Sequence, residues 1–306
     1  MININRLPCP EVLNDKGRRE TENVIAFYSN NQNLATPYQK PGTKQSYITY
    51  KDEQVRKTLT KMLNGKCAYC ESKILSIYNG DIEHFRPKSS YTSSDNKSTK
   101  PGYYWLCADW ENLLLSCPFC NQTHTHEIVD GNTITEIVLG KLDHFPLHDE
   151  ANRLKKNHGQ IFYTDAPSYR QAYFQEEQVR LLLKPCTDPN IESYFIYDDD
   201  GSILVNENMS TLDQLKAATS IRTYALQRLG LIQSRKEKII QIKAQVRRVK
   251  EAIINFDNNY DQLTERTWFE CILRREMEIL QKFTHANQEY AGMARYIIGK
   301  YMTFEP

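Results

Sequence analysis

The chain has 306 residues, 40% of them hydrophobic and 25% charged, which is enough apolar material for a sizeable core and about two domains. The formal net charge is +1, so the chain as a whole does not attract a polyanion, and a nucleic-acid surface would have to be a local basic patch. Neither a secretory leader nor a run of roughly eighteen apolar residues occurs, and we expect a cytoplasmic protein without a membrane span.

The first half of the chain predicts one helix and one pair of strands. Residues 1–50 contain no motif and are expected to be irregular. Val55, Leu59 and Met62 then recur at helical spacing, and Gly65 follows as a C-cap, which predicts a helix. Residues 72–87 alternate around an Asn-Gly turn signal and predict two short strands, the second ending in the run DIEH.

The second half predicts hairpins and then helices. A Ser/Thr/Lys-rich stretch, 88–102, is typical of a mobile loop, and an aromatic segment, 103–124, should pack beneath a site and start a helix near its second cysteine pair. Asp-Gly turns predict hairpins over 127–140 and 192–205. From residue 208 helical periodicity runs almost to the end, and it includes a basic helix face that is more typical of a solvated surface than of a binding site.

Four of the eight cysteines form two C-x-x-C pairs, whereas the other four are scattered. Two such pairs supply the tetrahedral thiolate set of a structural zinc ion, which leaves no coordination position open for catalysis. Buried cysteines without a metal are the alternative. The predicted ligands are Cys67, Cys70, Cys117 and Cys120.

A zinc ion at these cysteines would bring the DIEH run close to the residues after Cys120. Glu83, His84, Asn121 and His124 would then be neighbours. A carboxylate and amides suit a divalent cation, and an imidazole can take a proton from water near neutral pH. The alternatives are a core histidine at 84 and helix-capping asparagines at 112 and 121.

The pattern C-x-x-C, E-H-F-R-P-K and W-x-N-L-L-L-S-C-x-x-C-N resembles the HNH endonucleases with a ββα-metal core. Within them it is similar to the PtuB-like nucleases of Septu and retron antiphage systems. The core resemblance covers roughly residues 50–150. HFPLHDE from 144, LLLKPCTDP from 181 and LQRLGLIQSRKEKI from 226 extend the resemblance to that subgroup.

The resemblance implies a role for each matching position. His84 would be the general base that activates water, and Glu83, where many members carry aspartate, would be a ligand of a catalytic Mg²⁺ or Mn²⁺. Asn121 would complete that metal site. Asn112 would fix the loop that orients the base, and His124 would contact phosphate or metal. Arg86 and Lys88, which follow the base closely, are candidates for contacts with the nucleic-acid backbone, with plain surface charge as the alternative, and Lys141 is a candidate for a phosphate contact.

We therefore expect an α+β protein with a zinc-stapled ββα-metal core, additional hairpins and a C-terminal helical domain. The expected divisions are 1–50 (irregular), 51–150 (nuclease core), 151–207 (connecting region with a hairpin) and 208–306 (helical assembly domain). The expected function is a metal-dependent endonuclease acting on DNA or RNA.

The resemblance further implies a PtuA-type ATPase that gates the nuclease, and for the retron type a reverse transcriptase with its DNA/RNA hybrid (msDNA). The rival interpretation is a zinc-ribbon protein that binds nucleic acid or acts as a scaffold without catalysis. A third is an interaction subunit whose nuclease site is degenerate, which the glutamate at position 83 suggests.

Overall fold

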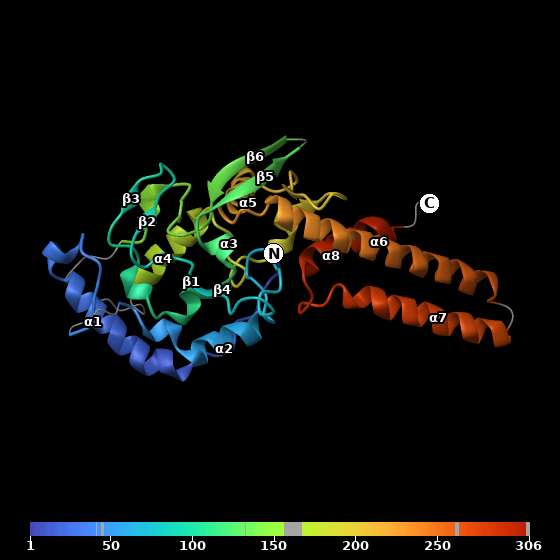
Figure 1. The fold of residues 1–306 in the computed structure, drawn as a ribbon, viewed down its shortest axis with the longest axis horizontal. Coiled ribbons are helices and arrows are strands. Elements are labelled where there is room, and N and C mark those ends of the chain that lie inside the picture. The colour runs from blue at the N-terminus through green and yellow to red at the C-terminus, as the bar shows by residue number, and fades with distance from the viewer. Residues whose placement is uncertain (41, 44–45, 132, 156–166, 261–262, 304–306) are drawn as a thin grey trace.

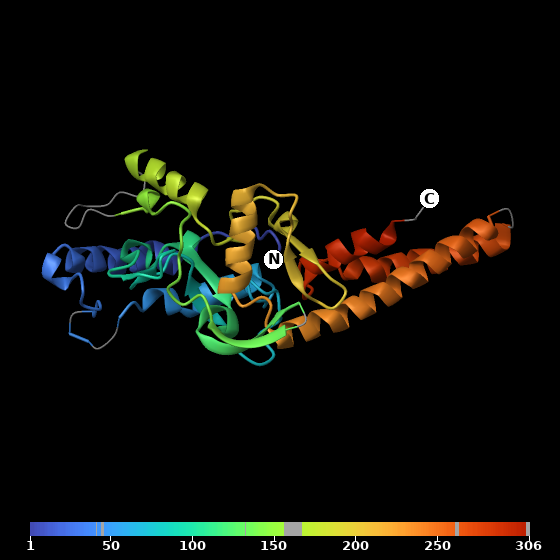
Figure 2. The same ribbon diagram turned by 90° about the horizontal axis from the view of Figure 1, so that it is seen from above.

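The computed structural model describes residues 1–306 except 41, 44–45, 132, 156–166, 261–262 and 304–306. A mixed body holds the small sheets, and two long antiparallel helices, α6 and α7, project from it (Figures 1 and 2). The helices are α1 (Arg18–Tyr28), α2 (Glu53–Met62), α3 (Pro118–Asn121), α4 (Pro167–Val179), α5 (Thr211–Thr223), α6 (Leu229–Asn258), α7 (Leu263–Lys282) and α8 (Ala291–Met302). No helix in the described part of the chain is both long and apolar enough to cross a membrane.

The eight short strands in the described residues form four separate antiparallel pairs. They are β1 (Asp81–His84) with β4 (Leu113–Ser116), β2 (Tyr91–Thr92) with β3 (Ser98–Thr99), β5 (His124–Asp130) with β6 (Thr133–Leu139), and β7 (Phe195–Tyr197) with β8 (Ile203–Val205). The two hairpins predicted from Asp-Gly turns are confirmed as β5–β6 and β7–β8.

The pair β1 and β4 lies in the middle of the body, between α2 and α3 (Figure 1). All four residues of β4 are buried, as expected of an apolar strand covered on both faces. In the register of this pair, Asp81 lies opposite Ser116 and His84 opposite Leu113. The DIEH run therefore begins beside the end of β4, where the chain continues into Cys117 and α3.

The predicted helix before the first cysteine pair is confirmed as α2. The carboxylate of Asp52 accepts a hydrogen bond from the Gln54 amide at 2.9 Å and so caps the first turn. Val55, Leu59 and Met62 are buried along one face of the helix. The chain then turns through Gly65, whose φ of +68° favours glycine, into the first cysteine pair.

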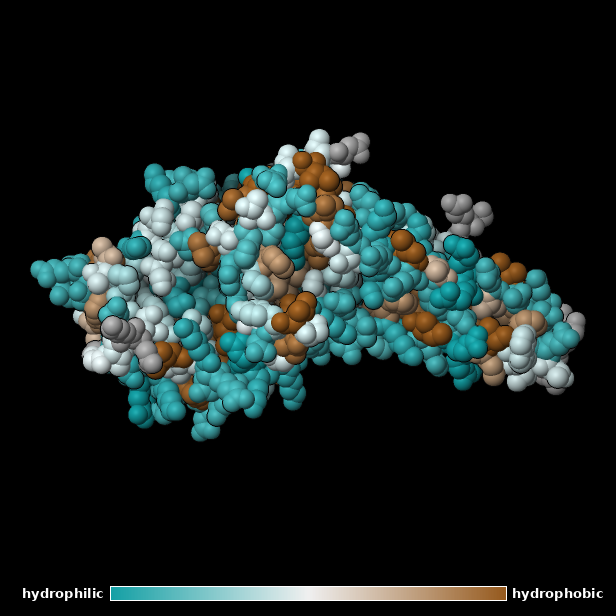
Figure 3. Space-filling view, in the orientation of Figure 1, coloured by the Kyte–Doolittle hydropathy of each residue, from teal (hydrophilic) through white to brown (hydrophobic). Residues whose placement is uncertain are grey.

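The predicted C-terminal helices are confirmed as α5 to α8. Ser210 caps α5, and the apolar stripe of α6 is buried against α7 and α8. On the basic face of α6, Lys243 pairs with Asp199 at 2.7 Å, so part of that face serves internal contacts. On the side drawn in Figure 3 the surface is mostly hydrophilic, with small separate hydrophobic patches over the projecting helices.

Several sequence predictions of secondary structure are wrong. Leu13–Tyr28 form a π-helical turn and α1 within the supposedly irregular segment. Residues 75–77 form a turn and no strand precedes β1 there, so β1 pairs with the distant β4. The supposed loop over 88–102 contains the short β2–β3 pair. The connecting region contains α4, which was not predicted, and part of that region lies outside the described residues.

Candidate functional site

The four paired cysteines converge on one point. The sulfur atoms of Cys67, Cys70, Cys117 and Cys120 all lie within 4.8 Å of one another and are buried. The Cys70 and Cys117 sulfurs are 3.8 Å apart, close to the spacing of about 3.8 Å that tetrahedral zinc–thiolate bonds of about 2.3 Å require. The cluster is therefore compatible with one structural zinc ion held by four thiolates.

Two further contacts lie at this cluster: one joins the first cysteine pair to β4, and the other places a positive charge beside the sulfurs. The first cysteine pair is joined to β4 because the Ala68 amide donates to the Leu115 carbonyl at 2.9 Å. The guanidinium of Arg228 lies 3.6 Å from the Cys120 sulfur and 4.0 Å from the Cys117 sulfur. Four thiolates around a divalent ion carry a net charge of −2, and the buried Arg228 offsets part of it.

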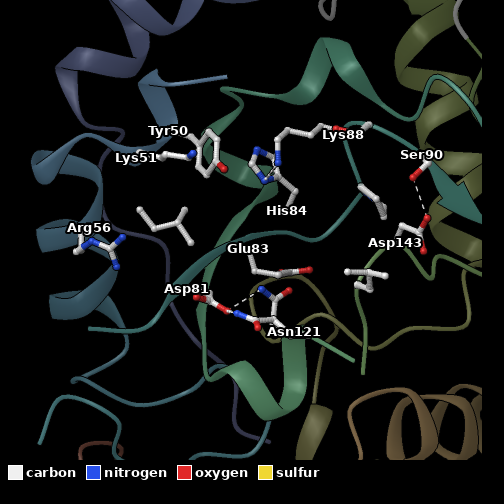
Figure 4. A pocket seen from close by; sticks show the side chains of 15 residues that line it. Tyr50, Lys51, Arg56, Asp81, Glu83, His84, Lys88, Ser90, Asn121 and Asp143 are labelled. Carbon is white, nitrogen blue, oxygen red and sulfur yellow. Dashed lines mark hydrogen bonds between the residues drawn. The ribbon is translucent and has the colours of Figure 1, made fainter. Parts of the chain in front are cut away.

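A cleft of about 540 Å³ opens over β1, on the side of α3 and α2. Its floor includes Asp81, Glu83, His84 and Asn121. Its other wall is basic and aromatic, with Tyr50, Lys51, Arg56 and Lys88. In Figure 4 the carboxylates of Asp81 and Glu83 lie beside the Asn121 amide, and the His84 ring lies between them and Lys88.

The imidazole of His84 is oriented by a backbone carbonyl. Its Nε2 lies 2.8 Å from the carbonyl oxygen of Cys107, so Nε2 carries the proton and Nδ1 keeps its lone pair. The ring of Tyr50 packs edge-on against it, with centroids 4.5 Å apart. Burial and the neighbouring Lys88 lower the pKa of His84 well below its ordinary value of 6.5. The imidazole is therefore neutral at pH 7 and able to accept a proton.

Glu83 is buried against a lysine. Its Oε1 lies 2.5 Å from the Nζ of Lys141, and its Oε2 accepts a hydrogen bond of 2.6 Å from the Tyr69 hydroxyl. Lys141 also donates to the His84 carbonyl at 3.0 Å. The backbone before Lys141 passes close to that of Gln122. Only a glycine fits at position 140, because a Cβ there would lie 1.9 Å from the carbonyl oxygen of Gln122.

Asn121, directly after the last cysteine, is fixed by Asp81. Its Nδ2 donates to a carboxylate oxygen of Asp81 at 3.0 Å, and the side chain of Gln122 donates to the same oxygen at 2.9 Å. With its amide nitrogen used in this way, the Oδ1 of Asn121 is the atom left to face a cation. Asp81 and Asn121, 40 positions apart in the sequence, are thus in direct contact.

Asn112 lies beneath the cleft and does not line it. Its Oδ1 accepts from the Arg86 amide at 2.7 Å, and its Nδ2 donates to the carbonyls of Arg86 and Leu106 at 3.0 and 3.3 Å. The side chain therefore joins the loop after His84 to the turn before β4. The positioning role that the resemblance implies for Asn112 stays a prediction.

His124 lies apart from the other predicted site residues. It is at the start of β5, does not line the cleft, and its ring lies 5.4 Å from that of Phe119 and 6.0 Å from that of His126. Arg86 also points away, because Glu176 and Glu177 of α4 bind its guanidinium. Of the predicted catalytic and metal-binding residues, Glu83, His84 and Asn121 line the cleft, and so does Lys88, a candidate for a contact with the nucleic-acid backbone.

Sequence reasoning did not identify several residues that the structure places at these sites. Asp81 lies in the DIEH run, but the motif assigns it no role. Tyr69 and Arg228 had no local signal, because their contacts join distant parts of the chain. The sequence suggests only a phosphate contact for Lys141, whereas the structure pairs it with Glu83.

Comparison with known proteins gives a consistent set of relatives. The Septu protein PtuB of Bacillus mycoides (strain KBAB4) is 35% identical over 246 residues, which cover 79% of this chain and 69% of that protein. The Septu protein PtuB of Bacillus thuringiensis is 36% identical over 76 residues, 24% of each chain. The Septu protein PtuA of the same B. mycoides strain is 26% identical over 151 residues, 49% of this chain but only 16% of PtuA.

No protein-family model matches the chain. The first of these relatives nevertheless decides the family, since its similarity extends over most of both proteins and far beyond the segment between the cysteine pairs. The chain belongs to the PtuB family of Septu proteins.

Proposed function

We propose that this chain is a metal-dependent endonuclease that hydrolyses nucleic-acid phosphodiester bonds, with His84 as the general base. One arrangement supports the proposal above all others. The pair β1 and β4, followed by α3, brings an oriented imidazole, a carboxylate and an amide to the same cleft. Two strands followed by a helix and clamped by four cysteines are also the order that the HNH resemblance implies.

Glu83 and Asn121 would hold the catalytic Mg²⁺ or Mn²⁺, with Asp81 beside them. Carboxylate and amide oxygens are the ligands that such hard cations prefer. Oε1 of Glu83 is buried without a hydrogen bond among the described residues, and its neighbour is the Lys141 ammonium, so this position already balances a positive charge. When bound, the metal would stabilise the charge that develops on the phosphate and on the leaving oxygen.

The residues of the chain would perform the proton transfer. Nδ1 of His84 takes a proton from a water molecule, whose oxygen attacks phosphorus as the bond to the 3′ oxygen breaks. The Cys107 carbonyl holds the imidazole in the required tautomer throughout. The leaving 3′ oxygen takes a proton from solvent and His84 returns its proton to solvent, so the products carry a 5′ phosphate and a 3′ hydroxyl. Lys51, on the facing wall, would pair with phosphates of the strand, beside Arg56, whose Nη1 donates to the carbonyls of Asn79 and Gly80 at 3.0 and 2.6 Å.

The biological setting that we propose is antiphage defence. Similarity to Septu PtuB proteins supports this setting. The B. mycoides strain that has the first PtuB relative also has a similar Septu protein, PtuA. We infer that a PtuA-type ATPase gates this nuclease, with the C-terminal helices as the assembly region. A retron reverse transcriptase with its msDNA is a further partner that the initial resemblance suggests.

The deciding experiment uses the chain together with any partner that co-purifies. DNA, total RNA and tRNA are incubated with the complex, with and without added Mg²⁺. The buffer is freed of divalent cations beforehand and contains no chelator, because a chelator would strip the zinc. We expect metal-dependent cleavage of one substrate class. His84→Ala should abolish it, whereas the control His148→Ala, at an exposed histidine outside the cleft, should not.

Zinc content and thermal unfolding of each variant show whether the fold is intact. If His84→Ala cuts as fast as the wild-type chain, the catalytic role is wrong. The non-catalytic alternative, a zinc-ribbon binding or scaffolding subunit, would then be favoured, with the Glu83–Lys141 pair as a purely structural contact. Appearance of activity only in Glu83→Asp would instead favour a degenerate nuclease site.

A further inference from the structure

The nitrogen of His84 that would accept the proton faces a lysine. The Nζ of Lys88 lies 3.3 Å from His84 Nδ1. Because Nε2 donates to the Cys107 carbonyl, Nδ1 holds the lone pair, and the contact requires the lysine to be the donor. Burial lowers the pKa of Lys88 to about 8, so this side chain still carries most of its charge at pH 7. In the structure as it stands, the base is covered.

Two tyrosine rings hold the lysine in this position. The Nζ of Lys88 lies 4.7 Å from the centroid of the Tyr50 ring and 5.5 Å from that of the Tyr47 ring. An ammonium over aromatic faces is stabilised electrostatically, most strongly where water is excluded. Tyr50 also packs on the His84 ring, so the cage and the base form one unit. No carboxylate within ion-pair distance competes for Lys88 among the described residues.

The surroundings offer one class of ligand that can draw the lysine away. Lys88 lines the same cleft as Lys51 and Arg56, and a phosphodiester entering there brings a negative charge to that wall. The long flexible stem of a lysine lets its ammonium move between acceptors without a change in the backbone. An ammonium paired with a phosphate oxygen no longer covers Nδ1.

We propose that Lys88 covers the base until a phosphodiester occupies the cleft, and that it then moves to the phosphate and exposes His84 Nδ1. The substrate would therefore activate the base that cuts it. This inference rests on the proposed nuclease function and adds a regulatory step to the same site. Lys88 then has two roles, covering Nδ1 of His84 before substrate binds and pairing with the phosphate afterwards, which a purely structural lysine would not combine.

The test measures the accessibility of His84 separately from cleavage. Wild type, Lys88→Met and Lys88→Gln are treated with diethyl pyrocarbonate at pH 7 without substrate, and carbethoxylation of His84 is followed by peptide mass spectrometry. Loss of a charge-assisted hydrogen bond should raise the modification rate by about tenfold. The matched control is Lys51→Met, since Lys51 also lies over the Tyr50 ring, at 5.6 Å, but does not contact His84. It should leave the rate within about twofold.

Cleavage is measured on the same protein samples. Both Lys88 variants should cut more slowly than wild type although their base is more reactive, because the phosphate has lost its partner. Unchanged modification of His84, or cleavage at the wild-type rate or faster, would overturn the inference. Zinc content verifies that each variant is folded.

The nuclease proposal is judged separately on wild type and His84→Ala. If wild type cuts, His84→Ala does not, and the Lys88 variants leave His84 modification unchanged, only the role of Lys88 is refuted. If wild type cuts no nucleic acid, both proposals fail.

Discussion

Replacement of Lys141 by methionine tests how the buried charge of Glu83 is balanced. Lys141 is 0% exposed and Glu83 3% exposed. The substitution keeps most of the side-chain volume but removes the ammonium 2.5 Å from Oε1, leaving the carboxylate with the Tyr69 hydroxyl as its remaining partner. Removing one partner of a buried ion pair costs about 3–5 kcal/mol, and we expect that loss in the free energy of unfolding.

The same variant reports on metal binding without any activity assay. In wild type a cation at Glu83 must compete with Lys141, whereas in Lys141→Met it replaces the missing charge. Binding at a hundredfold excess over the dissociation constant would restore about 2.7 kcal/mol. Added Mg²⁺ should therefore stabilise Lys141→Met more than wild type, and should do little for the double variant Glu83→Gln/Lys141→Met.

The assay is urea unfolding in buffer freed of divalent cations, repeated with added Mg²⁺. Lys184→Met is the matched control. Lys184 is also 0% exposed, but its Nζ has no hydrogen-bond partner among the described residues. Its replacement therefore does not deprive a carboxylate of a bonded partner. The reasoning is refuted if Lys141→Met costs less than about 1 kcal/mol, or if Mg²⁺ stabilises Lys141→Met and the double variant equally.

Three further outcomes are expected. Cys120→Ser should release zinc and unfold the core, and native protein with less than about half a zinc atom per chain would count against the cluster. Asn112→Ala leaves the Arg86 amide without its acceptor and should lower the free energy of unfolding by about 2–4 kcal/mol in urea, whereas a loss near zero would contradict the positioning role. Burial by itself would raise the pKa of Glu177, but the charges of Arg180 and Arg86 outweigh the effect of burial and lower this pKa from 4.5 to about 2. Because the folded pKa is the lower one, this stabilisation of about 3 kcal/mol is present above pH 4.5 and lost as the pH falls toward 2. Glu177→Gln should therefore flatten the acid dependence of urea unfolding, and an unchanged slope would contradict the assignment.

Two helices could not be predicted from the sequence, for the same physical reason. Each of them buries an acidic side chain where an amphipathic pattern would have an apolar one. In α1, Glu20 is buried and accepts hydrogen bonds from the backbone amides of Ile48 and Thr49. In α4, Glu176 is fully buried between Arg86 and the Tyr103 hydroxyl. A hydrophobic stripe cannot reveal a helix face whose buried groups are polar and satisfied by distant partners.

The sequence by itself determined the features that depend on local spacing. Cysteines two residues apart turn both sulfurs toward one ion, Asp-Gly sets a hairpin, and periodic apolar residues set α2 and α6. The order of the motifs also placed Glu83, His84 and Asn121 together, because the cysteine pairs flank Glu83 and His84 and Asn121 directly follows the second pair.

The tertiary structure alone decided which atoms of these residues remain available. The proton on His84 is fixed by the backbone carbonyl of Cys107, which any residue would supply and no motif can mark. The charge of Glu83 is balanced by Lys141, a residue of a distant segment. Nδ1 of His84 is covered by Lys88, which lies over the rings of Tyr47 and Tyr50. Such contacts arise from the packing of remote segments into one small volume, where desolvation makes each pairing strong, and local sequence carries no record of them.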